Sequence, residues 1–224
     1  MKNIVVTGTS RGIGLQLALI LADAGHRVLA ISRKVPSELL GRPNVTCLAA
    51  DIADAGSFPR ILEVLETWKS VDAIIHNAGA IALKPFAQTS PEDFDRVYRV
   101  NVFAVAELTR TALPFLARGS HVVAISSMGG IQGSVKFAGL SAYSSSKGAV
   151  ITLMELLAEE FRDQGISFNA LALGSVNTEM LAEAFPGYKA PLEAVEMAAY
   201  VAQFALEGHR LFNGKVLPVS ASTP

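Results

Sequence analysis

The chain has few of the residues that would mark a disulfide-linked, metal-binding or membrane-spanning protein. It contains one cysteine, Cys47, so no disulfide can form within it and nothing points to an oxidising compartment. Its four histidines are His26, His76, His121 and His209. They are scattered without the spacing of a metal site, so we expect no bound metal. No uncharged apolar run approaches ~18 residues, and we therefore expect no membrane partner.

Charge is also scarce. Charged residues make up 17% of the 224 residues and the formal net charge at pH 7 is -1, which gives no reason to expect a nucleic-acid partner. An apolar strand begins at Asn3, which leaves no room for the charged region and cleavage site of a signal peptide. From these features we expect a cytoplasmic protein.

What the chain does contain is apolar sequence, at 50% of the residues, arranged as alternating strand and helix patterns. The pattern predicts strands over 3–7, 27–32, 44–49, 71–76, 120–126, 166–172 and 215–219. It predicts helices near 12–24, 57–69, 91–99, 102–117, 143–163 and 191–206. The strands are apolar on both faces, which is typical of a parallel sheet covered by helices on each side. We therefore expect one domain over residues 1–224, a doubly wound parallel α/β sheet of about seven strands.

Pro218 lies within the last predicted strand. Because proline cannot donate a hydrogen bond to a neighbouring strand, this position predicts that the strand lies at an edge of the sheet.

A glycine-rich turn joins the first strand to the first helix. Its residues run Thr7-Gly8-Thr9-Ser10-Arg11-Gly12-Ile13-Gly14, with the spacing G-x3-G-x-G. Glycines allow a tight turn and close approach of a pyrophosphate, which the free N–H groups of the helix N-terminus can bind. The turn predicts a dinucleotide site formed by Gly8, Ser10, Arg11, Gly12, Ile13 and Gly14.

The end of the second predicted strand indicates which dinucleotide binds. Folds that select NAD place an acid there to accept hydrogen bonds from the ribose 2′-hydroxyl. This chain has Ser32 instead, followed by Arg33 and Lys34. Because a guanidinium suits a 2′-phosphate, we expect NADP(H) in preference to NAD(H), with Ser32 and Arg33 at this end of the cofactor.

Tyr143 and Lys147 lie four residues apart in Tyr143-Ser144-Ser145-Ser146-Lys147, so they share one face of a helix. An ammonium near a phenol favours the phenolate and is expected to lower the tyrosine pKa. Such a tyrosine could give or take a proton at neutral pH. The pair therefore predicts an acid/base site.

Five further motifs follow later strands in order. They are Asp51-Ile52, Asn77-Ala78-Gly79, Val100-Asn101-Val102, Ser126-Ser127 and Gly174-Ser175-Val176-x-Thr178. With the glycine turn and Tyr143-x3-Lys147, they give the chain a pattern that resembles the short-chain dehydrogenase/reductase family over nearly its whole length.

The resemblance implies cofactor contacts at Asp51 and Ile52 beside the adenine, at Asn77, Ala78 and Gly79, at Tyr143 and Lys147, and at Gly174, Val176 and Thr178 beside the nicotinamide. It also implies a catalytic tetrad of Asn101, Ser127, Tyr143 and Lys147. In that mechanism a hydride passes between NADP(H) and a carbonyl or secondary alcohol, with Tyr143 as the general acid/base. Ser127 would bind the substrate oxygen, Lys147 would lower the tyrosine pKa, and Asn101 would hold a water that resupplies protons.

Three features depart from the family pattern. Ser127 precedes Tyr143 by 16 positions where about 13 is usual, so the choice between Ser126 and Ser127 stays open. Leu173 replaces the usual proline before Gly174, and a short segment near 178–190 takes the place of a longer substrate lid.

Two further expectations concern assembly and function. The helices near 102–117 and 143–163 are apolar around much of their circumference, which predicts a homodimer or homotetramer. A catalytically silent dinucleotide-binding sensor or scaffold on the same fold is the alternative to an enzyme, because fold does not imply function. The sequence identifies neither the substrate nor its stereochemistry.

Overall fold

A seven-stranded parallel sheet forms the centre of the computed structural model, which describes residues 1–220. The strands are β1 (Asn3–Thr7), β2 (Arg27–Ser32), β3 (Val45–Ala49), β4 (Ala73–His76), β5 (His121–Ser127), β6 (Ser167–Leu173) and β7 (Lys215–Val219). All seven predicted strands are present, with ends that differ by at most two residues. The predicted fold class is therefore confirmed.

The strand order is β3-β2-β1-β4-β5-β6-β7, so the chain moves outward in one direction from β1 and in the other from β4. Open parallel sheets bind ligands beyond the carboxyl ends of their strands, at the point where the order reverses. Pro218 lies in β7, which pairs only with β6 and is an edge strand, as its proline predicts.

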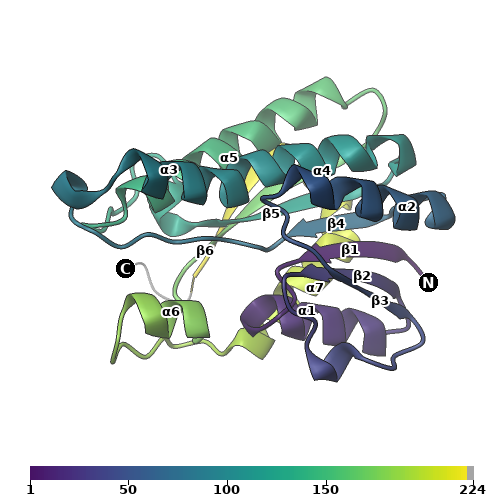
Figure 1. The fold of residues 1–224 in the computed structure, drawn as a ribbon. Helices are drawn as coiled ribbons and strands as arrows, with labels where there is room; N and C mark the ends of the chain where they lie inside the picture. The colour runs from purple at the N-terminus through teal and green to yellow at the C-terminus, as the bar shows by residue number, and fades with distance from the viewer. Residues whose placement is uncertain (221–224) are drawn as a thin grey trace.

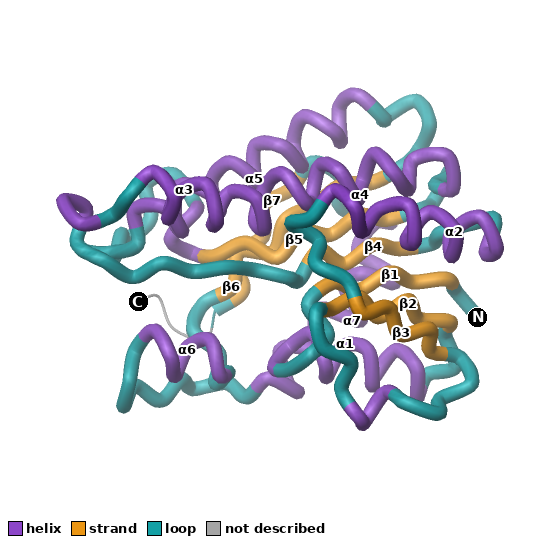
Figure 2. The backbone as a smooth tube through the Cα atoms, viewed as in Figure 1, coloured by secondary structure: helices purple, strands orange, loops and turns teal. Residues whose placement is uncertain are grey.

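Helices cover both faces of the sheet (Figure 1). They are α1 (Gly12–Asp23), α2 (Phe58–Trp68), α3 (Pro91–Tyr98), α4 (Ala104–Ala112), α5 (Ser141–Glu160), α6 (Glu179–Ala184) and α7 (Ala194–Glu207). One apolar core packs α2, α4 and α5 on one face, and a second packs α1 and α7 on the other. Figure 2 shows that the long loops after β4, β5 and β6 gather at the carboxyl ends of the strands. No helix within residues 1–220 is long and apolar enough to cross a membrane.

Predicted helix ends are displaced by a few residues, most of all at the end of α4 (Ala112, predicted near 117), and two further differences have a clear physical reason. The predicted break between 91–99 and 102–117 is absent, because a π-helical turn at Arg99–Phe103 joins α3 to α4. The last helix was predicted to begin at 191 but begins at Ala194. There the side chains of Glu193 and Glu196 each accept a hydrogen bond from the backbone N–H of the other residue, which favours that start over the proline.

Helix α6 was not predicted. Its N-terminus is capped by Thr178, whose Oγ1 accepts a hydrogen bond from the Leu181 N–H at 3.2 Å. The segment that the sequence placed near 178–190 thus contains a short helix beyond the end of β6 (Figure 1).

Candidate active site

The glycine turn between β1 and α1 brings backbone atoms closer together than any side chain would allow. Gly8 has φ +76°, and a Cβ on Gly14 would stand 2.1 Å from the Gly8 carbonyl oxygen. Arg11 caps α1 without a side-chain hydrogen bond to the helix backbone, and the first turn of α1 carries no acid. The backbone N–H groups of this first turn are free, and no carboxylate within the turn repels an anion, so they suit a phosphate. The turn therefore fits the pyrophosphate of a dinucleotide.

Asn77 connects this turn to the end of β4. Its Nδ2 donates to the carbonyl oxygens of Thr7 at 3.0 Å and Gly8 at 3.3 Å. In return the Thr7 Oγ1 accepts the N–H groups of Asn77 and Ala78, each at 3.1 Å. The side chain of Asn77 therefore holds the shape of the turn, and Ala78 supplies the small surface against which Gly8 packs.

The end of β2 leaves one guanidinium available. The Ser32 hydroxyl donates to the Lys34 carbonyl at 2.7 Å and receives a hydrogen bond from Thr9 at 3.2 Å. Ser32 is buried, so its contacts shape the turn. Arg33 is exposed and has neither a hydrogen bond nor an ion pair from its side chain within residues 1–220.

Asp51 and Ile52 follow β3 and have different surroundings. Asp51 is exposed, and its Oδ1 accepts the Ala53 N–H at 2.9 Å. Ile52 is buried in the core beneath α2. A contact with an adenine ring is therefore open to Asp51, whereas the side chain of Ile52 is largely occupied by packing.

The predicted acid/base pair lies where β5 ends and α5 begins. Ser127, the last residue of β5, faces the Tyr143 phenol closely enough to lower its pKa. Lys147 is 4% exposed; its Nζ lies 5.7 Å from the centroid of the Tyr143 ring and donates to the Ile125 carbonyl at 2.7 Å. Burial lowers the pKa of Lys147 to about 8. The structure thus brings Ser127, Tyr143 and Lys147 together.

The expected direction of the Tyr143 pKa shift was wrong. Burial raises the pKa of Tyr143 above its usual value, and the hydrogen bond from Ser127 only partly opposes this. Lys147 does not reverse the shift, because its ammonium is bonded to a β5 carbonyl and its own charge is disfavoured by burial.

The structure separates the two candidate serines. Ser126 is buried and donates to the Lys147 carbonyl at 2.9 Å, so it joins β5 to α5. Of the two serines, only Ser127 influences the pKa of the Tyr143 phenol. The longer spacing is accommodated by a 3-10 turn at Met128–Gly130 that packs against α5, where a Cβ on Gly130 would lie 2.7 Å from the Lys147 carbonyl carbon.

Asn101 lies in the π-helical turn and is 1% exposed. Its Oδ1 accepts the Ala80 N–H at 2.8 Å, and its Nδ2 donates to the Ala80 carbonyl and the Ser146 hydroxyl, both at 2.9 Å. These three bonds use both N–H donors of the side-chain amide and one of the two acceptor positions of Oδ1, so the expected water-holding role remains a prediction. Asn101 fixes the chain after β4 to α5.

Gly79 lies between these groups. A Cβ at that position would be 3.6 Å from the Asn101 Oδ1, 3.7 Å from the Lys147 Nζ and 3.9 Å from the Met180 Cε. The segment that contains α6 therefore reaches over the buried end of the site through Met180.

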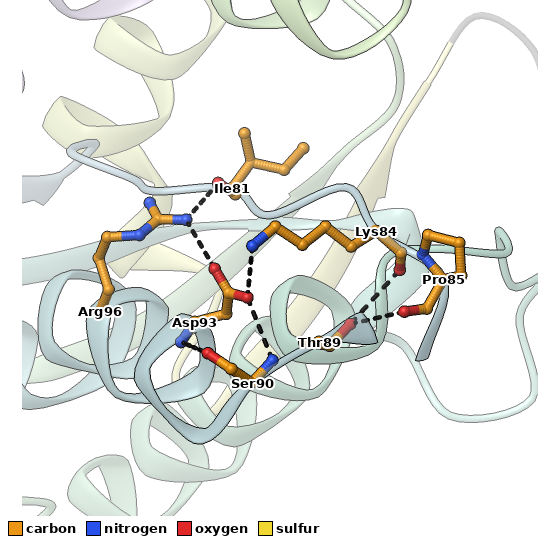
Figure 3. Close-up of polar contacts among 7 residues, drawn as sticks. All are labelled: Ile81, Lys84, Pro85, Thr89, Ser90, Asp93 and Arg96. Carbon is orange, nitrogen blue, oxygen red and sulfur yellow. Dashed lines mark hydrogen bonds and ion pairs between the residues drawn. The ribbon is translucent and has the colours of Figure 1, made fainter. Parts of the chain in front are cut away.

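The loop that follows Gly79 is held by Asp93 at the start of α3 (Figure 3). Its Oδ2 pairs with Lys84 at 2.7 Å and accepts the Ser90 N–H at 3.1 Å, while the Ser90 hydroxyl accepts the Asp93 N–H at 3.3 Å. Arg96 approaches the other Asp93 oxygen at 3.9 Å and donates to the Ile81 carbonyl. These contacts close one side of the carboxyl end of the sheet.

The segment after β6 closes the other side. The Gly174 N–H donates to the Val219 carbonyl at 2.9 Å, Val176 is buried, and Thr178 is occupied in capping α6. Arg11 pairs with Glu183 of α6, a contact that no sequence motif signalled. Ser10 beside it is exposed and Ile13 half-buried.

No group of three or more His, Cys, Asp or Glu side chains within residues 1–220 is arranged to hold a metal ion. The polar groups at the carboxyl end of the sheet are instead a phenol, a hydroxyl, an ammonium and backbone N–H groups.

Comparisons with known proteins agree with this arrangement. The family model for short chain dehydrogenase matches residues 2–189. Versicolorin reductase stcU of Emericella nidulans is 30% identical, covering 80% of this chain and 70% of that protein. Oxidoreductase UcpA of Salmonella typhimurium is also 30% identical, covering 90% of this chain and 87% of that protein.

Solved structures share the fold at full length. A short chain dehydrogenase from Burkholderia cenocepacia in complex with NADP superposes with a TM-score of 0.88 and 28% identity, covering 99% of this chain and 97% of the other. A 4-hydroxyisoleucine dehydrogenase complexed with NADH has a TM-score of 0.87 and 21% identity, which shows a common fold. From the family match, the sequence relatives and the ordered motifs, this chain belongs to the short-chain dehydrogenase/reductase family of oxidoreductases.

Proposed function

We propose that this protein is an NADP(H)-dependent oxidoreductase that interconverts a carbonyl and a secondary alcohol, with Tyr143 as the general acid/base. The observation that carries the proposal is the half-buried Tyr143 phenol, whose pKa Ser127 influences and whose ring Lys147 flanks. The Burkholderia relative in complex with NADP supports the choice of cofactor.

In the direction of reduction, Tyr143 donates its phenolic proton to the substrate oxygen as negative charge develops there. Its raised pKa keeps the phenol protonated at neutral pH, which suits an acid. Ser127 donates a hydrogen bond to the same oxygen. The Lys147 ammonium lies close enough to stabilise the resulting phenolate, and Asn101 keeps α5 in register with the loop after β4. The nicotinamide, when bound, supplies or accepts the hydride.

Some of the proposed cofactor residues would bind the dinucleotide directly, and others form the shape of its site. The backbone N–H groups at Gly12 and Ile13 would bind the pyrophosphate, and Arg33 would bind a 2′-phosphate. The Lys147 ammonium would reach the nicotinamide ribose. The remaining proposed contacts are Gly8, Ser10, Arg11, Gly14, Ser32, Asp51, Ile52, Asn77, Ala78, Gly79, Tyr143, Gly174, Val176 and Thr178.

The activity is tested with Tyr143→Phe, which removes only the hydroxyl. NADPH consumption is measured across ketones, aldehydes, quinones, 3-oxoacyl thioesters and pteridines. We expect the variant to lose at least about 100-fold in rate on any substrate that the wild type turns over, because proton transfer typically contributes that much. Equal rates for both proteins would refute the tyrosine mechanism and favour the catalytically silent sensor.

The cofactor preference is tested by titration. NADPH should bind more tightly than NADH, and Arg33→Ala should narrow the difference by weakening NADPH alone. Arg210→Ala is a matched control, because Arg210 is an exposed arginine at the end of α7 with no ion pair in the described residues. Equal affinities of the wild type for both cofactors would refute the preference.

We also propose that residues 1–224 form one domain, that residues 178–190 are its substrate lid, and that the protein is a homodimer or homotetramer. Exposed apolar side chains on the α4 and α5 side, Phe103 at 55% and Leu156 at 62%, support an interface between copies. Light scattering coupled to size-exclusion chromatography should give a dimeric or tetrameric mass; a monomeric mass would refute the assembly.

A further inference from the structure

An ion pair joins the glycine turn to the proposed lid. Arg11 presents both terminal nitrogens to the carboxylate of Glu183, with Nη1–Oε1 at 2.5 Å and Nη2–Oε2 at 3.2 Å. Arg11 caps α1 and Glu183 belongs to α6, so the contact spans 172 residues of sequence. Bidentate pairing uses the edge of the planar guanidinium, where its N–H donors lie and where a phosphate would also bind.

A second acid of α6 faces the same place. Glu179 lies four residues before Glu183, and its Oε2 is 3.4 Å from where a Cβ of Gly12 would stand. Two like charges at this spacing destabilise a helix unless positive charge opposes them. The N-terminus of α1 and Arg11 provide that positive charge, and α1 has no acid of its own in its first turn. The carboxylates of α6 are therefore directed at the anion-binding end of α1.

Packing contributes little to this position of α6. Of its six residues only Ala184 is buried. A cavity of about 440 Å³ separates α6 from α1, lined among others by Leu15, Gln16, Leu181 and Tyr188. With so little apolar contact, the polar contacts to Arg11 and the cap at Thr178 are what keep α6 against the turn.

We propose that Glu183 sets the affinity of this protein for its dinucleotide, because its carboxylate occupies the Arg11 guanidinium that a cofactor phosphate would otherwise bind. The inference rests on the dinucleotide site of the proposed function. Binding then exchanges a carboxylate for a phosphate at Arg11, and the two acids of α6 must withdraw from the incoming negative charge. The hydrogen bond from Arg11 lowers the pKa of Glu183, which agrees with a carboxylate that stays charged while it occupies the guanidinium.

The test compares Glu183→Gln, which keeps size and polarity but removes the charge, with wild type and with Glu155→Gln. Glu155 is exposed on α5, away from the lid, and matches the change in net charge. Dissociation constants for NADPH and NADH are measured by titration at low ionic strength. Because the pair is solvent-exposed, we expect Glu183→Gln to bind roughly two- to fivefold more tightly and Glu155→Gln to match the wild type.

The two cofactors identify the phosphate concerned. An equal gain for NADPH and NADH would assign the pyrophosphate to Arg11, and a gain for NADPH alone would assign the 2′-phosphate. In the background of Arg11→Ala the gain should disappear. Unchanged or weaker binding by Glu183→Gln, or a gain that persists without Arg11, would overturn the proposal.

A measurement without cofactor separates this inference from the proposed function. Trypsin cleavage after Lys189, an exposed residue that follows α6, should be faster in Glu183→Gln than in wild type or Glu155→Gln. Equal cleavage rates would overturn the tethering of α6 by Glu183 even if the enzyme binds and turns over normally. Failure of the wild type to bind either dinucleotide would instead refute the cofactor site of the proposed function and, with it, the exchange at Arg11.

Discussion

The inner part of the site and its outer part are held by different forces. In the inner part, the half-buried amide of Asn77 and the buried amide and ammonium groups of Asn101 and Lys147 bond to backbone carbonyls. In the outer part, α6 is held largely by Arg11 and Glu183, whose side chains are 48% and 62% exposed. Breaking a hydrogen bond between buried groups leaves them without water or another partner and costs much free energy. An exposed ion pair contributes only ~0–1 kcal/mol to stability.

This difference matches the demands on each part. Proton transfer requires the phenol, hydroxyl and ammonium to keep their places, because small misplacements cost large factors in rate. The outer part has to admit a cofactor and a substrate and release products, so weak contacts suit it. Three experiments can break or sharpen the comparison.

The largest effect is expected from Gly14→Ala in the inner part. The new Cβ would stand 2.1 Å from the Gly8 carbonyl oxygen, and backbone atoms cannot move aside cheaply. We expect a loss of more than about 4 kcal/mol in the free energy of unfolding, or no folded protein.

The matched change outside the inner part is Gly133→Ala, in the loop between β5 and α5. Its φ is +78° but a Cβ would meet nothing within 4 Å, so only the left-handed conformation costs energy, ~1–2 kcal/mol. Chemical denaturation measures both variants. Similar losses for the two would contradict the distinction between the two parts.

A smaller effect is expected from Asn101→Ala. The change leaves both backbone polar groups of Ala80 without a partner and removes the hydrogen bond that the Ser146 hydroxyl accepts, at about 3 kcal/mol in total; that hydroxyl still donates to the Tyr143 carbonyl. Ser134→Ala, in the same loop as Gly133, is the counterpart outside the inner part. The Ser134 hydroxyl donates to the Met128 carbonyl, and removing this hydrogen bond should lower the free energy of unfolding by about 1 kcal/mol. Denaturation again reports both, and a larger loss for Ser134→Ala would reverse the ranking.

The smallest effect is a pH dependence that involves His76, the residue before Asn77. Burial beside Thr109 lowers its pKa from 6.5 to about 3. Between these values the unfolded chain binds the proton and the folded chain does not, so stability present above pH 6.5 is lost as the pH falls. The loss is about 1.4 kcal/mol for each pH unit well below 6.5.

In His76→Asn that contribution should be absent, so the stability of the variant should fall less steeply than that of wild type between pH 6 and 5. His26→Asn is the control, because His26 is only half-buried and its pKa is lowered less far. Denaturation curves at several pH values give the slopes. Parallel slopes for His76→Asn and wild type would show that His76 does not stay neutral in the folded protein.

Much of the inner part could be predicted from sequence because its signals are local. Apolar runs located all seven strands, the glycine spacing located the turn, and the i, i+4 spacing placed Tyr143 and Lys147 on one face of α5. The outer part gave weaker signals. Helix α6 is only six residues long, too short for a periodic pattern, and the pairing of Glu183 with Arg11 depends on how the chain returns to β1.

By itself the sequence determined the fold class, the family and the types of residue that gather at the carboxyl ends of the strands. Local propensity and periodicity suffice for the fold class, and short motifs in a fixed order carry the resemblance to the family, since each is a property of short segments. The tertiary structure alone decided that Ser127 rather than Ser126 meets the phenol, that both N–H donors of the Asn101 amide are used, and that the Tyr143 pKa rises. The burial of a polar group and its hydrogen-bond partners from distant segments depend on how the chain folds back on itself, and no local pattern encodes them.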